Sequence, residues 1–186
     1  MKKTRNLTIL LSAVIMMVSL ICGTALAKRP TPPPVCGGLT GTWHGEESGD
    51  MIWLAIHTSD SLDPTKGEML MNWIWISPNL IGPDVSLTPG HGVWQLNSDG
   101  TSNYTWYAYA IGTDGSPLYT VRVSGVALFN PEDPDDCNTV FIYYEFAYFN
   151  SVVPVGELNT AIPDGSITGG AVETRVPMVV TPLPEQ

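Results

Sequence analysis

Runs of alternating aromatic, β-branched and polar residues, separated by short polar turns, fill most of the chain between residues 39 and 176. The block from 90 to 129 shows the pattern most clearly, because three such runs are joined by turns that contain Asp99-Gly100 and Asp114-Gly115. Asp-Gly favours tight hairpin turns, since glycine takes positive φ without a Cβ clash and aspartate tolerates the left-handed region. The block therefore predicts three consecutive antiparallel strands.

Five further runs have the same character, and no stretch of ten or more residues shows a capped helical period. Eight sequential strands predict an all-β fold, either an up-and-down barrel or a sandwich. Long loops are expected at 77–89 and 150–164, and in an up-and-down barrel both lie at the same end, which is the expected open mouth. The five additional strands are expected over 39–46, 51–57, 68–76, 139–149 and 166–176.

The first 27 residues have the pattern of an export signal. Lys2, Lys3 and Arg5 precede an apolar run over 7–21, and Ala25-Leu26-Ala27 matches an A-x-A cleavage site. The mature protein is thus expected in the periplasm or outside the cell, with no stable membrane insertion after cleavage. The expected divisions are a signal peptide at 1–27, a proline-rich linker at 28–38, a barrel domain at 39–177 and a tail at 178–186.

The charge of the mature chain excludes some partners. It keeps five Lys and Arg against 18 Asp and Glu, a formal charge of −13. Such a surface disfavours nucleic acid and anionic membranes and favours solubility. The oligomeric state is not indicated by the sequence.

Two cysteines remain after signal cleavage, Cys36 and Cys137. Export implies an oxidising compartment, so a disulfide between them is predicted, with two free thiols as the alternative. In an up-and-down meander, Cys36 lies just before the first strand and Cys137 just before the seventh. Both cysteines are therefore expected at the same end of the barrel.

Gly41-Thr42-Trp43, at the head of the first strand, resembles the G-x-W signature of lipocalins and related calycin barrels. Arg175 near the end of the last strand matches the arginine that packs across this tryptophan in that superfamily. The block 90–94, the hairpin after it and Val121-Arg-Val-Ser-Gly125 also resemble a group of secreted bacterial lipocalin-like proteins. The resemblance implies an eight-stranded antiparallel up-and-down barrel closed at one end by Trp43 and Arg175.

Aromatic side chains on the strands are the main functional signal. By the period of two, Trp73 and Trp75 are expected on one face, and Tyr104 and Trp106 on one face of another strand. These four side chains are the predicted walls of a ligand pocket. The alternative is that they are ordinary core residues.

Arg122 and Glu145 are charged residues inside predicted strands, at similar heights on neighbouring strands. If they point inward, one of them anchors a ligand, because a desolvated charge is costly without a partner. The alternative is a pair on the outer surface.

Other chemistry finds little support. Three histidines, His44, His57 and His91, would suffice for a zinc site, but His57 is expected at the closed end of the barrel and His91 at its mouth. No two of them share a strand face, so no metal is predicted. A role for His91 as a general base remains open. The sequence has no nucleophile motif, phosphate loop or dinucleotide fingerprint, so neither a catalytic residue nor a cofactor is predicted.

Together these features favour an exported, non-catalytic protein that binds a small apolar or amphipathic molecule in a barrel. Two alternatives stay open. One is an isomerase or cyclase that uses Glu145 or His91 inside the cavity. The other is a structural or cell-surface interaction module with a filled barrel and an exposed apolar patch.

Overall fold

The computed structural model describes residues 36–133 and 135–177. The predicted signal peptide (1–27), most of the predicted linker (28–38) and the predicted tail (178–186) lie outside the described residues.

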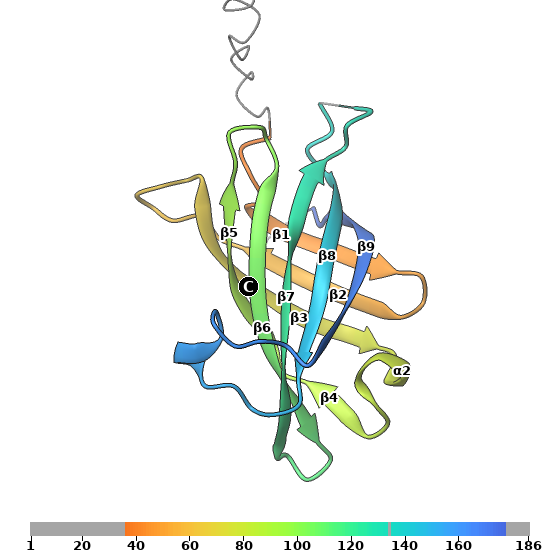
Figure 1. Cartoon of the computed structure of the whole chain (residues 1–186). Helices are drawn as coiled ribbons and strands as arrows, with labels where there is room; N and C mark the ends of the chain where they lie inside the picture. The colour runs from red at the N-terminus through yellow and green to blue at the C-terminus, as the bar shows by residue number, and fades with distance from the viewer. Residues whose placement is uncertain (1–35, 134, 178–186) are drawn as a thin grey trace, which may run out of the picture. The chain divides into compact units, whose positions relative to one another are not determined.

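Eight strands form a closed antiparallel barrel, which confirms the fold class predicted from the sequence (Figure 1). Each strand pairs with its neighbours around the ring, and two pairings, β6 with β7 and β1 with β9, close it. A ninth, short strand (β4) pairs with the far half of β6. The strands are β1 Gly41–Glu47, β2 Met51–His57, β3 Lys66–Ile76, β4 Val85–Leu87, β5 Gly90–Leu96, β6 Ser102–Gly112, β7 Pro117–Phe129, β8 Thr139–Phe149 and β9 Gly165–Arg175.

The period of two along each strand separates core from surface. On β6, Tyr104, Trp106 and Ala108 are buried, and the residues between them are only partly buried. Successive side chains of a strand point to opposite faces of the sheet, so one face of every strand fills the barrel. The core is rich in tryptophan and methionine from β1, β2, β3, β5 and β6, in valine and alanine from β7, and in aliphatic and aromatic residues from β8.

One end of the barrel is closed by Trp43 and Arg175. Trp43 is fully buried, and the Arg175 guanidinium lies 4.4 Å from its ring centroid. Arg175 also donates from Nη1 to the Thr40 carbonyl at 2.7 Å. Gly41 has a φ of +136°, and a Cβ there would lie 2.6 Å from Arg175 Nη1, so only glycine fits beneath the guanidinium.

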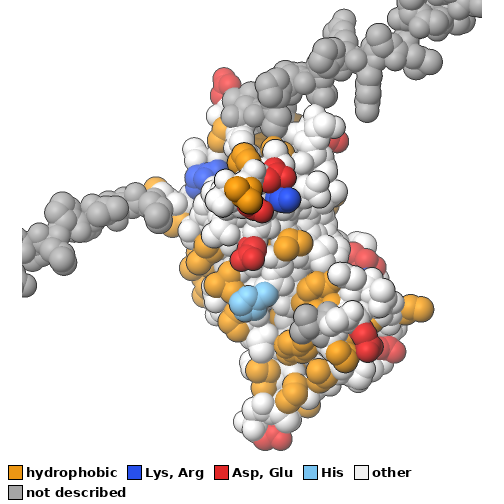
Figure 2. Space-filling model, turned by 90° about the vertical axis from the view of Figure 1, so that its left-hand side faces the viewer, with side chains coloured by type: hydrophobic (Ala, Val, Ile, Leu, Met, Phe, Trp, Pro, Cys, Tyr) orange, Lys and Arg blue, Asp and Glu red, His pale blue; other side chains and the backbone are white. Residues whose placement is uncertain are grey.

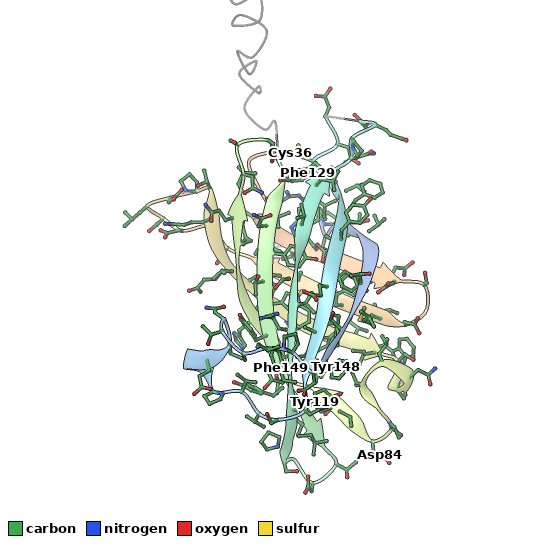
Figure 3. All side chains as sticks on the ribbon, viewed as in Figure 1. Cys36, Asp84, Tyr119, Phe129, Tyr148 and Phe149 are labelled. Carbon is green, nitrogen blue, oxygen red and sulfur yellow. A yellow bond between two sulfur atoms is a disulfide. The ribbon has the colours of Figure 1, made fainter. Side chains whose placement is uncertain are left out.

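The predicted disulfide is present at the same end. Cys36 and Cys137 are bonded, with a Cα–Cα distance of 5.2 Å. The Cys137 carbonyl accepts a hydrogen bond from Arg175 Nε at 3.1 Å. Figure 3 shows Cys36 and Phe129 at this end, and Tyr119, Tyr148 and Phe149 at the other.

The segment 77–89, predicted as a loop, forms a short helix and a strand. The helix α2 (Pro78–Ile81) is capped by the Ser77 hydroxyl, which accepts from the Asn79 amide. Leu80 of α2 and Leu87 of β4 pack against the core. The segment therefore covers core residues near the end of the barrel that was predicted to be its open mouth.

The segment 150–164 was also predicted to lie at the mouth, but it folds over the outer face of the barrel. It contains a 3-10 helix, η1 (Val155–Glu157). Its Leu158 packs with Phe149, and Tyr107, which points outward from β6, donates to Asn159 at 2.5 Å. Figure 1 shows the segment crossing in front of β6 and β7.

Candidate functional site

A cavity lies inside the barrel, and its walls are almost entirely apolar and aromatic. It runs through the interior from Leu39 at the closed end to Met51 and Phe146 further along. Three tryptophans and two tyrosines face it together with one carboxyl and one imidazole. The lining residues are Leu39, Met51, Trp53, His57, Met69, Met71, Trp73, Tyr104, Trp106, Val123, Ala127, Ile142, Tyr144, Phe146 and Glu173.

Glu173 supplies the carboxyl, and Trp53 fixes its position. Gly45 on β1 pairs with Trp53 on one side and with Glu173 on the other. A Cβ at Gly45 would lie 2.3 Å from the Trp53 ring, so the missing side chain lets the indole cross β1. Trp53 Nε1 then donates to Glu173 Oε1 at 2.6 Å. A Trp-Gly-Glu row across three strands thus holds a carboxyl inside an apolar barrel.

Burial raises the pKa of Glu173 to about 7, and the hydrogen bond from Trp53 offsets this only in part. The side chain is 4% exposed. Near neutral pH the group therefore takes both forms. The neutral form donates a hydrogen bond, and the charged form attracts a cation.

His57, at the end of β2, also faces the cavity. Neither Nδ1 nor Nε2 has a hydrogen-bond partner among the described residues. Burial, with a smaller contribution from the charge of Arg175, lowers the pKa of His57 to about 4. The imidazole is therefore neutral at pH 7, with one nitrogen able to donate and the other able to accept.

Trp73 stands between the other two tryptophans of the cavity. Its ring centroid is 6.5 Å from that of Trp53 and 5.3 Å from that of Trp106, with interplanar angles of 64° and 60°. The three indoles thus form angled walls rather than a parallel stack. Trp73 Nε1 is buried without a hydrogen-bond partner among the described residues.

The unsatisfied atoms point to a ligand because buried polar atoms in proteins are nearly always hydrogen-bonded. Four such atoms occur among the described side chains, and three of them belong to His57 and Trp73, which line this cavity. The fourth, Ser102 Oγ, lies outside the lining. The cavity thus offers two donors and one acceptor to whatever enters it.

The cavity is narrow as it stands, with about 30 Å³ open to water-sized molecules. This is room for about two waters. Met51, Met69 and Met71 form part of the wall, and methionine side chains adapt their shape easily. A ligand of several heavy atoms therefore requires these side chains to move.

The barrel wall is incomplete beside the cavity, between β1 and β9. These strands pair only through Trp43–Glu46 and 172–175, so among the described strands 165–171 has no partner on that side. Tyr144 lies over Gly169 at this place and donates to the carboxylate of Glu47. Burial, and then Glu47, raise the pKa of Tyr144. The Tyr144–Glu47 hydrogen bond thus links the β1 edge to β8.

Three of the four predicted wall residues, Trp73, Tyr104 and Trp106, line this cavity. Trp75 does not, and the prediction that it shares a face with Trp73 is wrong. The register of β2 against β3 shifts at a bulge, so that Trp73 pairs with Trp53 but Trp75 pairs with Ile52. The extra residue, Ile74, reverses the alternation, and Trp75 is 43% exposed on the outer face.

Arg122 and Glu145 lie on the outer face, so neither anchors a ligand in the interior. Arg122 lies between the buried Val121 and Val123, and its guanidinium is 5.5 Å from the Phe149 ring centroid. Glu145 is opposite Ser124, whereas Arg122 is opposite Ala147, so the two charges are not cross-strand partners. The inward orientation considered from the sequence is incorrect.

The interior polar residues that sequence reasoning missed are Glu173 and His57. The sequence did contain a clue to Glu173. Arg175 was expected to pack across Trp43 and so to face the interior, and the period of two along the strand places residue 173 on the same inner face. His57 shares its face with Ala55 and Trp53 by the same rule.

No group of three metal-ligating side chains occurs in the part of the chain that the structure describes. His91 is exposed on the outer face of β5, opposite Tyr107. The alternative enzyme required His91 or Glu145 inside the cavity, and both lie outside it. The helices in the described ranges are too short to span a bilayer.

The Glu173→Gln variant should respond to pH differently from the wild type. A raised folded-state pKa means that the glutamate favours folding below its ordinary value of 4.5, and this contribution is lost as the pH rises to about 7. Glutamine has the same shape and does not titrate. Relative to wild type, the variant should gain about 3 kcal/mol in unfolding free energy from pH 4.5 to 7.5. Urea denaturation across this range measures the gain.

The matched control is His57→Gln, for which the sign reverses. The lowered pKa of His57 makes wild-type stability rise with pH from about 4 to 6.5. As the pH rises from about 4 to 6.5, His57→Gln should therefore become less stable relative to wild type. Parallel curves for wild type and Glu173→Gln would show that Glu173 does not titrate as described.

Comparison with known proteins gives little beyond this geometry. No family model matches the chain. No curated protein matches it. Among solved structures, it is similar to the crystal structure of Xenavidin, with 11% sequence identity over 75% of this chain and 98% of that chain and a TM-score of 0.44. The fold described here rests on the strand pairing of the chain itself.

Proposed function

We propose that this chain is an exported, non-catalytic binding protein of lipocalin-like type that holds a small apolar or amphipathic molecule inside its barrel. The observation that carries the proposal is the set of unsatisfied buried atoms, His57 Nδ1 and Nε2 and Trp73 Nε1, on the wall of an aromatic cavity. Ligand sites are commonly apolar hollows with a few converging polar groups. A ligand with a hydrogen-bond acceptor facing Trp73 satisfies the indole, and one with a donor and an acceptor satisfies the imidazole.

The proposal is tested by native mass spectrometry of the mature chain, purified without denaturation, before and after addition of small apolar and amphipathic compounds. We expect a bound mass that Ala127→Leu removes, because Ala127 lines the cavity and a larger side chain fills it. Val126→Leu is the matched control, because Val126 is the preceding residue of β7 and points to the opposite face. Binding that survives in Ala127→Leu contradicts the proposal.

A second candidate function is an interaction module with a filled barrel. It is favoured by the small size of the cavity and by the outer face of β8 and β9, where Tyr143 is 59% and Val172 41% exposed. Aromatic side chains at this exposure are common at protein interfaces. The absence of any bound compound, together with self-association that Tyr143→Ser abolishes, would favour this candidate.

A further inference from the structure

The cavity combines angled aromatic walls with one buried carboxyl, and this combination indicates the class of ligand. Trp53, Trp73 and Trp106 line it with Tyr104 and Tyr144, and the carboxyl of Glu173 is held at the Trp53 edge of the group. The negative faces of aromatic rings attract cations, with tryptophan the strongest. Weakly hydrated organic cations gain most, because removing them from water costs little.

Glu173 has no cationic partner in the described part of the chain. The ion pair found there joins Lys66 and Asp63 on the surface. Arg122 is stacked on Phe149 and Arg175 on Trp43, so both guanidinium groups are engaged elsewhere. A buried acidic side chain is costly unless it stays neutral or meets a positive charge. A bound cation would supply that charge.

The edge of the barrel wall between β1 and β9 also carries acidic groups. At the gap between β1 and β9, Tyr144 contacts Glu47, and Asp50 is close enough to raise the pKa of Tyr144 further. On another face of the molecule, the one that Figure 2 shows, acidic side chains are also more widely spread than basic ones. An acidic surface raises the local concentration of cations and hinders anions.

We propose that the cavity selects a small organic ammonium ion, with the alkyl groups between the three indoles and the positive charge facing the Glu173 carboxylate. This inference rests on the proposed function, because it names the ligand class of the same cavity. The ion must be small, since only about 30 Å³ is open before the methionines move. Methylated ammonium ions that also carry a small polar group, such as a hydroxyl, for Trp73 Nε1 and His57 fit this description, and large or anionic molecules do not.

Binding should depend on the ionisation of Glu173 alone near neutral pH. Of the titratable groups that line the cavity with it, His57 is neutral because its pKa is about 4, and Tyr104 and Tyr144 are neutral because burial raises their pKa values. Arg175, the next charge along β9, stays positive throughout this range. With the pKa of Glu173 at about 7, the affinity for an ammonium ion should be about tenfold higher at pH 8 than at pH 6.

The experiment titrates tetramethylammonium chloride into the mature protein and follows the indole N–H signals of its six tryptophans by NMR. tert-Butyl alcohol is the neutral probe of matched size. We expect saturable shifts of the cavity indoles with tetramethylammonium, at least a tenfold loss of affinity in Glu173→Gln, and unchanged binding in Glu145→Gln. The second variant removes the same charge from the outer face of the barrel.

The outcomes separate this inference from the proposed function. If tert-butyl alcohol shifts the cavity indoles and tetramethylammonium does not, the ammonium inference is wrong and the binding function stands. If neither probe shifts the cavity indoles, the ammonium inference and the proposed binding of small molecules are both wrong. Equal losses in Glu173→Gln and Glu145→Gln would show surface attraction only and overturn the inference. Retained binding of tert-butyl alcohol by Glu173→Gln shows that the variant is folded.

Discussion

Replacing Trp43 with alanine is expected to lower the free energy of unfolding by about 3–5 kcal/mol, the usual cost of removing a large buried aromatic side chain. Trp43 is 0% exposed, and its Nε1 donates to the Leu39 carbonyl at 2.6 Å. The Phe129 ring lies 6.1 Å away, and the Arg175 guanidinium covers the indole. Alanine leaves a void at the closed end and removes the surface on which Arg175 stacks.

Urea denaturation of wild type and Trp43→Ala measures this loss. Trp75→Ala is the matched control, because it removes the same side chain from a position that is 43% exposed. A surface truncation should cost well under the core value, about 1 kcal/mol or less. If the two variants lose equal stability, the assignment of Trp43 to the core and Trp75 to the surface is wrong.

Removing the disulfide should destabilise the protein by up to about 4–5 kcal/mol, because the bond closes a long loop and restricts the unfolded chain. The two cysteines are 101 residues apart in sequence. The double variant Cys36→Ser, Cys137→Ser keeps the remaining contacts of the closed end, including the hydrogen bond from Arg175 to the carbonyl of residue 137. Its loss should therefore reflect the cross-link and not a collapse of that end.

Denaturant unfolding under non-reducing conditions measures the difference. Reduced wild-type protein is the control, and it should match the double variant because both lack the same cross-link. A double variant as stable as oxidised wild type would contradict the account of this end. So would two titratable thiols in the oxidised protein.

The alternation of apolar and polar residues was enough to predict eight antiparallel strands, because each strand of such a sheet buries one face along its length. The choice of a barrel over a sandwich came from the resemblance to calycin barrels. The same signal placed Tyr104 and Trp106 on one face, and both line the interior together with Trp73. It failed at Trp75, since a bulge at Ile74 changes the parity and nothing in the residues around it marks the extra position. Assigning faces from alternation assumes that the hydrogen-bond ladder between neighbouring strands has no bulge.

The polar part of the site was harder to predict for a different reason. Charges inside strands were the right class of residue to consider, but Arg122 and Glu145 were chosen over Glu173. Which face of a strand points inward depends on its register with neighbours, and register is a property of pairs of strands. The pairing of Trp43 with Arg175 sets that register for β9 and places Glu173 inside.

The interior of the barrel could not be sized from the sequence. The same aromatic residues can surround an open pocket or fill a core, depending on how the side chains fit together. Here Gly45 decides one part of that packing, because it lets Trp53 cross β1 to reach Glu173. The sequence shows that a strand contains a glycine, but it does not show which side chain from a neighbouring strand packs over it.

The most direct test of the binding function is a crystal structure of the mature protein, purified without denaturation and examined for density inside the barrel. We predict ordered non-protein density within hydrogen-bond distance of Trp73 Nε1 and His57, between the indoles of Trp53, Trp73 and Trp106. A barrel in which Trp73 Nε1 and both His57 nitrogens bond to protein groups, with no space between the indoles, would contradict it.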